Sequence, residues 1–194
     1  MLRPTTGTIR LGISLMLLAA LALAAGCQKP KEPPSPKVAA FTKEVQAVID
    51  RVAPPLTEPV SREDREGAQK ALKKAFSVCA DACEGLFYNV LILDQQGVLT
   101  AVYPPAEVKS LQFANYKAVQ KAFAEKKPNQ AILYLPNGTP IDIVFVPLIQ
   151  KDKTVGILAL GFEGNLVQDK RGLGTEEFLS LEFQSPGGQT GQQK

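Results

Sequence analysis

The chain has 194 residues, of which 45% are hydrophobic and 21% charged, as in an ordinary globular protein. Its formal net charge is +3, but Arg3 and Arg10 lie in a segment that we expect to be removed, so the mature protein is expected to be close to neutral. The sequence shows no basic stripe typical of nucleic-acid binding. The sequence contains no histidine, which excludes Ser-His-Asp and Cys-His catalysis, histidine-containing zinc sites and haem ligation through histidine. We expect no cofactor and no metal.

The first 26 residues have the pattern of an export signal. Two arginines precede an apolar run over residues 11–23, and three small residues follow it directly before Cys27. The apolar run is too short to cross a membrane comfortably. We therefore predict a signal peptide over residues 1–26.

The five residues that end at Cys27 read LAAGC and resemble the lipobox of bacterial lipoproteins. The resemblance implies attachment of diacylglycerol to the Cys27 sulfur, cleavage before Cys27 and acylation of the new amino group. Several acyl chains would hold the protein stably on the lipid bilayer. Because Gln28 follows in place of a retention-type Asp, the resemblance places the protein at the outer membrane, facing the periplasm, if the cell is Gram-negative. The alternative is an ordinary signal peptide with an incidental cysteine.

Residues 28–37 form a linker with four prolines, QKPKEPPSPK, which can make neither helix nor sheet. Such a segment favours extended polyproline II, a semi-rigid spacer that would hold the following domain roughly 30 Å from the lipid. A proline-rich stretch can instead be a docking motif for aromatic grooves. About 145 residues remain for a single domain over 38–183, which suffices for a real core. The Gly- and Gln-rich segment 184–194 is expected to be disordered.

Two helices are predicted before the first strand. Apolar residues recur at helical spacing over residues 41–52, and Pro54-Pro55 predicts the end of this helix. Ser61 is a candidate N-cap for a second helix, which Gly85 would terminate. Both helices are expected to cover one face of a sheet.

Cys79 and Cys83 lie four residues apart on the second predicted helix. In an oxidising compartment they could form a disulfide, although parallel Cβ vectors resist bridging unless the helix ends there. Alternatively, they are two small buried apolar residues. Their spacing is not that of a C-x-x-C redox motif, and two thiolates alone make a poor metal site.

Five strands are predicted, over residues 88–94, 98–103, 131–135, 141–149 and 155–162. Asp94 and Gly97 fit the turn of the first hairpin, whereas a catalytic Asp94 would lack a partner carboxylate nearby in the sequence. Asn137-Gly138 favours a two-residue type I′ turn in the second hairpin, because both central residues need positive φ. The last two strands are apolar on both faces, so helices must flank both sides of the sheet.

Residues 109–126 predict a helix between the hairpins, and residues 175–183 predict a short helix after a polar segment. Asn115 falls within the apolar face of the first of these helices, with Tyr116 at its margin. A polar side chain at such a position needs a partner. That partner is either a neighbouring loop carbonyl or a small ligand in a pocket.

The order of these elements is similar to that of PAS-like Cache sensor domains, which are bacterial extracytoplasmic ligand-binding modules. The resemblance covers residues 41–162. It implies an α+β fold with an antiparallel five-stranded sheet, a long N-terminal helix on its back, and a small ligand on its front beneath the central helix and loops. The ligand-binding candidates that it implies are Tyr103, Asn115, Tyr116, Tyr134 and Asp142.

Three functions are compatible with these features. The first is a membrane-anchored extracytoplasmic lipoprotein whose Cache-like domain senses a small ligand. Because we expect one lipid anchor and no output domain, it would act through an envelope partner protein. The second is a non-enzymatic protein–protein scaffold with a roadblock- or longin-like fold. The third, an envelope enzyme, lacks support from any nucleophile motif, phosphate loop or metal cluster in the sequence.

Overall fold

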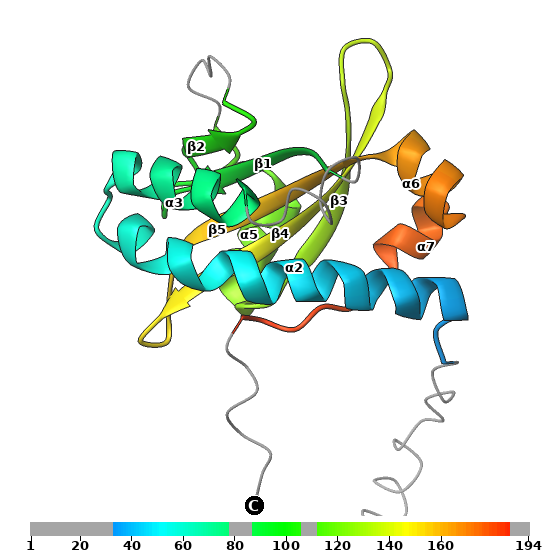
Figure 1. Cartoon of the computed structure of the whole chain (residues 1–194), viewed down its shortest axis with the longest axis horizontal. Coiled ribbons are helices and arrows are strands. Elements are labelled where there is room, and N and C mark those ends of the chain that lie inside the picture. The colour runs from blue at the N-terminus through cyan, green and yellow to red at the C-terminus, as the bar shows by residue number, and fades with distance from the viewer. Residues whose placement is uncertain (1–32, 78–86, 106–111, 187–194) are drawn as a thin grey trace, which may run out of the picture. The chain divides into compact units, whose positions relative to one another are not determined.

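The computed structural model describes residues 33–77, 87–105 and 112–186 (Figure 1). The compact unit that begins at Ser35 contains all the helices and strands named below. The predicted signal peptide, Cys27, Cys79 and Cys83 lie outside the described residues, so the lipid anchor and the disulfide stay predictions. Within the described ranges, no helix is both long enough and apolar enough to span a lipid bilayer.

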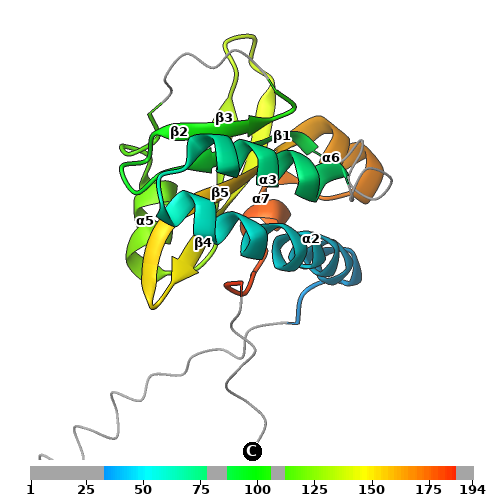
Figure 2. The same cartoon turned by 60° about the vertical axis from the view of Figure 1, so that its left-hand side comes forward.

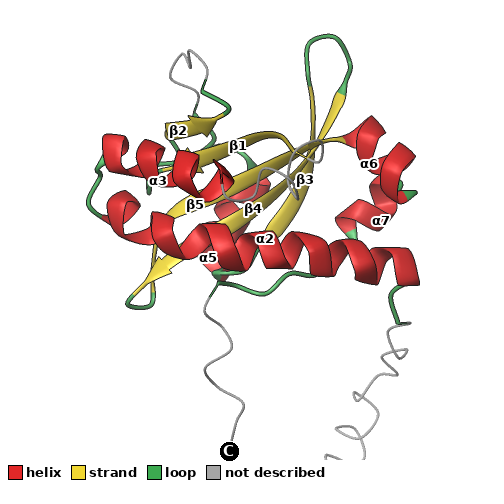
Figure 3. Ribbon diagram, viewed as in Figure 1, coloured by secondary structure: helices red, strands yellow, loops and turns green. Residues whose placement is uncertain are grey.

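A five-stranded antiparallel sheet forms the centre of the domain, with strand order β2-β1-β5-β4-β3 (Figure 3). The strands are β1 (Phe87–Leu93), β2 (Leu99–Tyr103), β3 (Asn129–Tyr134), β4 (Pro140–Gln150) and β5 (Lys153–Glu163). The two longest strands, β4 and β5, lie in the interior of the sheet and are buried on both faces along most of their length. The predicted α+β fold with a five-stranded antiparallel sheet is confirmed.

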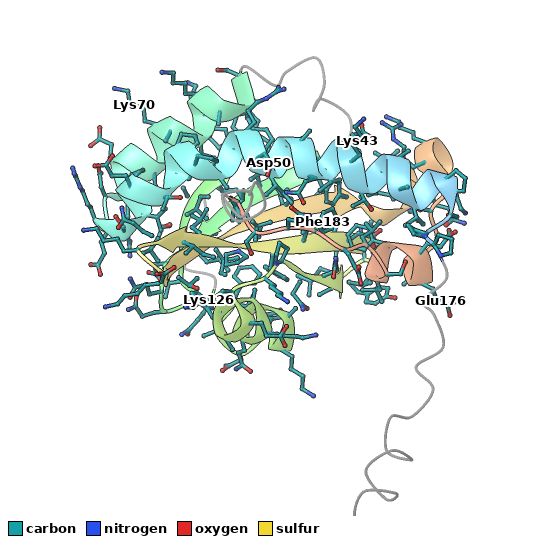
Figure 4. All side chains as sticks on the ribbon, turned by 90° about the horizontal axis from the view of Figure 1, so that it is seen from below. Lys43, Asp50, Lys70, Lys126, Glu176 and Phe183 are labelled. Atoms are coloured by element: carbon teal, nitrogen blue, oxygen red, sulfur yellow. The ribbon has the colours of Figure 1, made fainter. Side chains whose placement is uncertain are left out.

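Helices cover both faces of this sheet, and Figure 4 shows it between them. The helices are α2 (Pro36–Ser61), α3 (Arg65–Ser77), α5 (Lys117–Glu125), α6 (Gly164–Arg171) and α7 (Thr175–Leu179). Helices α2, α3, α6 and α7 pack with one set of strand side chains, on what we call the α2 face. Helix α5 packs with the other set, on the α5 face. Figure 2 shows α5 beside the hairpin of β4 and β5.

Helix α2 does not end at Pro54-Pro55, so the predicted boundary is wrong. The helix continues through both prolines and through Pro59 as far as Ser61. A proline inside a helix removes one hydrogen bond and crowds the preceding turn. Burial offsets this cost, because Leu56 follows the two prolines and is completely buried in the core. Tertiary packing therefore overrides the local signal.

The start of α3 also differs from the prediction. Ser61 is the last residue of α2, and its hydroxyl donates to the Glu58 carbonyl at 2.7 Å rather than capping a new helix. The N-terminal end of α3 is capped by Asp64, whose Oδ1 accepts a hydrogen bond from the Gly67 N–H at 2.8 Å. The turn between the helices places Glu63 at a φ of 56°.

At the outer edge of β2, a side chain of α3 pairs with the backbone of Val102. The Gln69 Nε2 donates to the Val102 carbonyl at 2.9 Å, and the Val102 N–H donates to the Gln69 Oε1 at 3.1 Å. The carboxamide makes the two hydrogen bonds that a neighbouring strand would otherwise make. The other edge strand of the sheet is β3.

The type I′ geometry predicted for Asn137-Gly138 occurs in a different hairpin. The hairpin of β3 and β4 forms as predicted, but of its two central residues only Gly138 has positive φ, at 82°. The type I′ pattern instead occurs between β4 and β5, where Lys151 and Asp152 have φ values of 47° and 62°. In the first hairpin, Asp94 Oδ1 accepts from the backbone of residues 96 and 98, as expected for a turn aspartate.

Helix α6 lies in the polar segment that precedes the predicted short helix. It begins directly after β5 and is held by buried Val167 and by a two-point contact between Arg171 and Glu44 of α2, at 2.7 and 3.0 Å. After α7, the Gln184 N–H donates to the Gln46 Oε1 at 2.8 Å, so the first part of the expected tail contacts α2.

Candidate ligand-binding site

Two predicted ligand-binding residues, Tyr103 and Tyr134, lie at opposite edges of the sheet. Tyr103 ends β2 and Tyr134 ends β3, so four strand spacings of about 4.8 Å separate them, or about 19 Å in total. Tyr103 stacks on Phe76 of α3 with ring centroids 5.3 Å apart. Tyr134 is 70% exposed. These two side chains therefore do not belong to one pocket.

Asn115 and Tyr116 lie in a turn before α5, not on a helix. The Phe113 N–H donates to the Gly97 carbonyl at 2.8 Å, which ties this turn to the hairpin of β1 and β2. Asn115 is exposed, so the expectation that it lies in the apolar face of a helix is wrong. Tyr116 is also exposed, and its ring lies against Phe113 at 5.4 Å between centroids.

Asp142 is buried in β4 on the α2 face, with only 4% of its surface exposed. Its neighbours across the sheet are Ile132 on β3 and Phe162 on β5. Gly164, the first residue of α6, approaches so closely that an added Cβ would lie 3.2 Å from the Asp142 Oδ1. Burial raises the pKa of Asp142 from 3.8 to about 6. Asp142 therefore differs from the other four candidates in that its side chain is buried.

The α5 face contains a polar residue that the sequence-based candidates do not include, Asn89. A bulge in β1 shifts the pairing between Phe87 and Asn89. As a result Phe87 packs on the α2 face. Asn89 lies two residues before Leu91, which packs on the α5 face, so strand alternation places Asn89 on that face as well. Bulges re-aim side chains in this way and are frequent beside functional sites.

Asn89 lies directly across from Gly161 of β5. A Cβ added at Gly161 would lie 2.3 Å from the Asn89 Oδ1, so the carboxamide occupies the space that a side chain at position 161 would fill. This oxygen is buried and accepts no hydrogen bond from any residue that the structure describes. An unpaired buried acceptor is costly and rare in native structures. Asn89 is therefore a candidate for contact with a ligand.

The neighbouring residues of β4 and β5 on the α5 face are apolar except for one carboxylate. Ile143 lies beside Gly161 on β4, and Ile141 lies beside Glu163, two residues after Gly161. Strand alternation places Glu163 on the α5 face, because Phe162 packs on the α2 face. Glu163 is half-buried and makes no side-chain cap to α6. We call Asn89, Ile141, Ile143, Gly161 and Glu163 the Asn89 site.

Helix α5 lies at the opposite half of the same face. The turn that precedes it contacts Gly97 through Phe113, and the Lys126 Nζ after its C-terminal end donates to the Asp152 carbonyl at 2.6 Å. Both contacts are at the end of the sheet where β1 ends and β5 begins (Figure 2). The Asn89 site is at the other end of these two strands.

A separate pocket of about 230 Å³ lies between the turn that joins α2 to α3 and the turn that joins β1 to β2. Its lining includes the carboxylates of Asp64 and Asp94. Both carboxylates already accept backbone hydrogen bonds, one as the cap of α3 and the other in the hairpin turn. These acidic residues are accounted for by the local structure, and none of the five sequence-based candidates lines this pocket.

Comparison of the sequence with protein-family models and with curated proteins found no match. Solved structures do show the same fold. A domain described as that of a sensory box/GGDEF family protein from Vibrio parahaemolyticus has a TM-score of 0.57 at 11% identity, covering 73% of this chain and 60% of that chain.

Two further structures are similar. An extracellular domain described as that of histidine kinase vpHK1S-Z8 has a TM-score of 0.57 at 13% identity, covering 70% of this chain and 55% of that chain. The ligand-binding domain of the Pseudomonas fluorescens chemoreceptor CtaA in complex with L-serine has a TM-score of 0.53 at 11% identity, covering 69% and 57%. This chain therefore spans 55–60% of the length of these structures and shares the fold of PAS/Cache-like sensor domains with them.

Proposed function

We propose that this protein is an extracytoplasmic lipoprotein whose Cache-like domain binds a small ligand on the α5 face and reports its presence to a partner protein. The observation that carries the proposal is the fold, which is that of extracellular sensor domains. The Asn89 oxygen on the α5 face, which has no hydrogen-bond partner within residues 33–77, 87–105 and 112–186, supports ligand binding, because a ligand donor would satisfy it. The protein is not an enzyme in this proposal.

The anchor in this proposal is the acylated Cys27, followed by the proline-rich spacer. Such a protein would be held at the outer membrane and face the periplasm. A lipid anchor lies in one leaflet and cannot carry a conformational change across the bilayer, so the signal must pass to an envelope protein. Metabolic labelling with radioactive palmitate tests the anchor. The wild type should be labelled and found in membranes, and Cys27→Ser should be unlabelled.

Ligand binding is tested by a thermal-shift screen of the full chain in detergent with amino acids, amines, organic acids and nucleobases. Binding to the folded state alone raises the unfolding temperature in proportion to the logarithm of ligand concentration. We expect one class of compound to raise it with this logarithmic dependence on concentration. If no compound does so, and pulldown from solubilised envelope yields a stable protein complex, the scaffold function would replace this proposal.

A further inference from the structure

We infer that a group of exposed lysines at one end of the domain binds the anionic headgroups of a lipid bilayer and thereby orients the domain on the membrane. This inference rests on the proposed lipid anchor, which keeps the domain near a bilayer. The lysines belong to two segments, residues 117–127 and 151–153, and we call them the lysine patch. Its members are Lys117, Lys121, Lys126, Lys127, Lys151 and Lys153.

The fold brings these two segments together. The first comprises α5 and the two residues after it, and the second contains the turn between β4 and β5. The Lys126 Nζ donates to the Asp152 carbonyl at 2.6 Å, so the two segments are in direct contact. Figure 4 shows Lys126 on the side of the sheet that α5 covers, away from Lys70 of α3. The sequence alone does not show this patch, because its lysines come from two separate segments.

The patch has an excess of positive charge. Its two segments contain six lysines and two carboxylates, Glu125 and Asp152, which gives a net charge of +4. All six lysines are exposed, and within the part of the chain that the structure describes none of them forms an ion pair. The contact of Lys126 with a carbonyl group leaves its charge uncompensated. This charge is therefore available to an anionic surface.

Three residues in these segments have a backbone conformation that favours glycine or asparagine. Lys126 ends α5 with a φ of 54°, and Lys151 and Asp152 have φ values of 47° and 62° in the turn. The left-handed region is unfavourable for a side chain such as that of lysine. Backbone strain of this kind is concentrated at functional sites. These positions therefore support a role for the lysines beyond folding.

An anionic bilayer fits the patch better than a protein does, because protein interfaces are depleted in lysine and enriched in aromatic residues. Phe123, the aromatic residue of the two segments, is half-buried against the core of the α5 face, so the exposed surface lacks an apolar anchor. Lysines near an anionic membrane surface contribute to binding through their charge. The predicted spacer would keep the domain within roughly 30 Å of the lipid, so the patch can reach it. Bound in this way, the domain would turn α5 toward the lipid and α2 away from it.

The test measures binding of the chain from Gln28 onward to lipid vesicles by sedimentation. This chain lacks the predicted signal peptide and Cys27 but keeps the whole compact unit that begins at Ser35, so neither an apolar leader nor acyl chains contribute. We expect it to bind vesicles that contain phosphatidylglycerol but not vesicles of phosphatidylcholine alone, and to be released by added salt. Combining Lys121→Gln, Lys127→Gln and Lys153→Gln should weaken binding roughly a hundredfold, or about fivefold for each lysine.

A matched variant separates the patch from the net charge of the protein. Combining Lys70→Gln, Lys73→Gln and Lys74→Gln removes the same charge from exposed positions of α3 and should leave vesicle binding unchanged. Both triple variants should keep the unfolding temperature of the parent chain, because surface substitutions of this kind change stability little. Equal weakening of vesicle binding in the two triple variants would overturn the inference.

The variant Lys151→Asn separates the charge from the backbone strain. Asparagine adopts the left-handed conformation more readily than lysine does, so this variant should unfold at a higher temperature than the parent chain. It should also bind the anionic vesicles about fivefold more weakly. Higher stability with unchanged binding would argue against a function of the lysine at this position.

The outcomes distinguish this inference from the proposed function. Equal binding to both kinds of vesicle, or binding to neither, would overturn the inference, whereas acylation of Cys27 and the response to small ligands are measured separately and would stand. Absence of palmitate labelling would refute the anchor and with it the orienting role of the patch, even if the vesicles bind.

Discussion

Replacing Asp142 with asparagine should remove most of the pH dependence of stability that this buried carboxyl introduces. Burial raises its pKa from 3.8 to about 6, so the folded protein binds a proton more tightly than the unfolded chain does. The free energy of unfolding must therefore decrease as the pH rises from about 4 to about 6, and level off above that range. The rise in pKa corresponds to about 3 kcal/mol.

The net loss of free energy of unfolding is smaller than this. Helix α6 begins beside the carboxylate at Gly164, and the positive end of its dipole stabilises the ionised form by about 0.3–1 kcal/mol. We therefore expect wild type to lose about 2 kcal/mol of stability between pH ~4 and pH ~6.5, and Asp142→Asn to lose much less over the same range. Above pH ~6.5, the variant should be the more stable protein.

Urea denaturation at a series of pH values measures this effect, since the midpoint and slope give the free energy of unfolding at each pH. Asp169→Asn, at an exposed position of α6, is the matched control and should keep the pH profile of wild type. A wild-type stability that rises with pH across the window, or an identical profile in Asp142→Asn, would refute the reasoning.

Three further variants test the packing, the sheet edge and the helix contacts. Leu56→Ala should lower the free energy of unfolding by about 2–5 kcal/mol in urea denaturation, because this fully buried residue holds α2 together beyond its prolines; a loss below about 1 kcal/mol would contradict this. Gln69→Leu should lower the free energy of unfolding by about 1–3 kcal/mol, because both backbone groups of Val102 lose their partners. Light scattering of this variant should detect more self-association than in wild type. Arg171→Lys loses the two-point contact with Glu44 and should cost less than about 1 kcal/mol, since both side chains are about a third exposed; a cost that stays the same at high salt would argue against a charge interaction.

The strands were predictable because their pattern depends on burial alone. The segments around Val146 and Leu158 are apolar on both faces, and this pattern requires a sheet covered on both sides whatever the details of the chain. The end of α2 was not predictable from Pro54-Pro55, because the burial of Leu56 against the distant strands decides it. The turn of the second hairpin also differs from the prediction, because Gly138 is the one residue of its central pair with positive φ. The next turn, at Lys151 and Asp152, adopts the geometry that Asn137-Gly138 favours locally.

The candidate site depended on strand order, which the sequence pattern does not specify. Tyr103 and Tyr134 each end a strand near a turn, but the order β2-β1-β5-β4-β3 places them at opposite edges. Asn89 had a visible signal, because it interrupts an otherwise apolar strand. Its importance follows from its position across from Gly161, and that pairing depends on a bulge that local sequence does not reveal.

The hydrogen bonds between Gln69 and Val102 also determine how copies of this protein can combine. A sheet with two free edges can pair head to tail, edge β3 of one copy with edge β2 of the next, and such pairing repeats without limit into a fibre. Because Gln69 already pairs with the backbone of Val102, that route is hindered at the β2 edge. Pairing through β3 alone joins two copies about a twofold axis and then stops. Copies of this domain can therefore form pairs through β3 more readily than they form polymers.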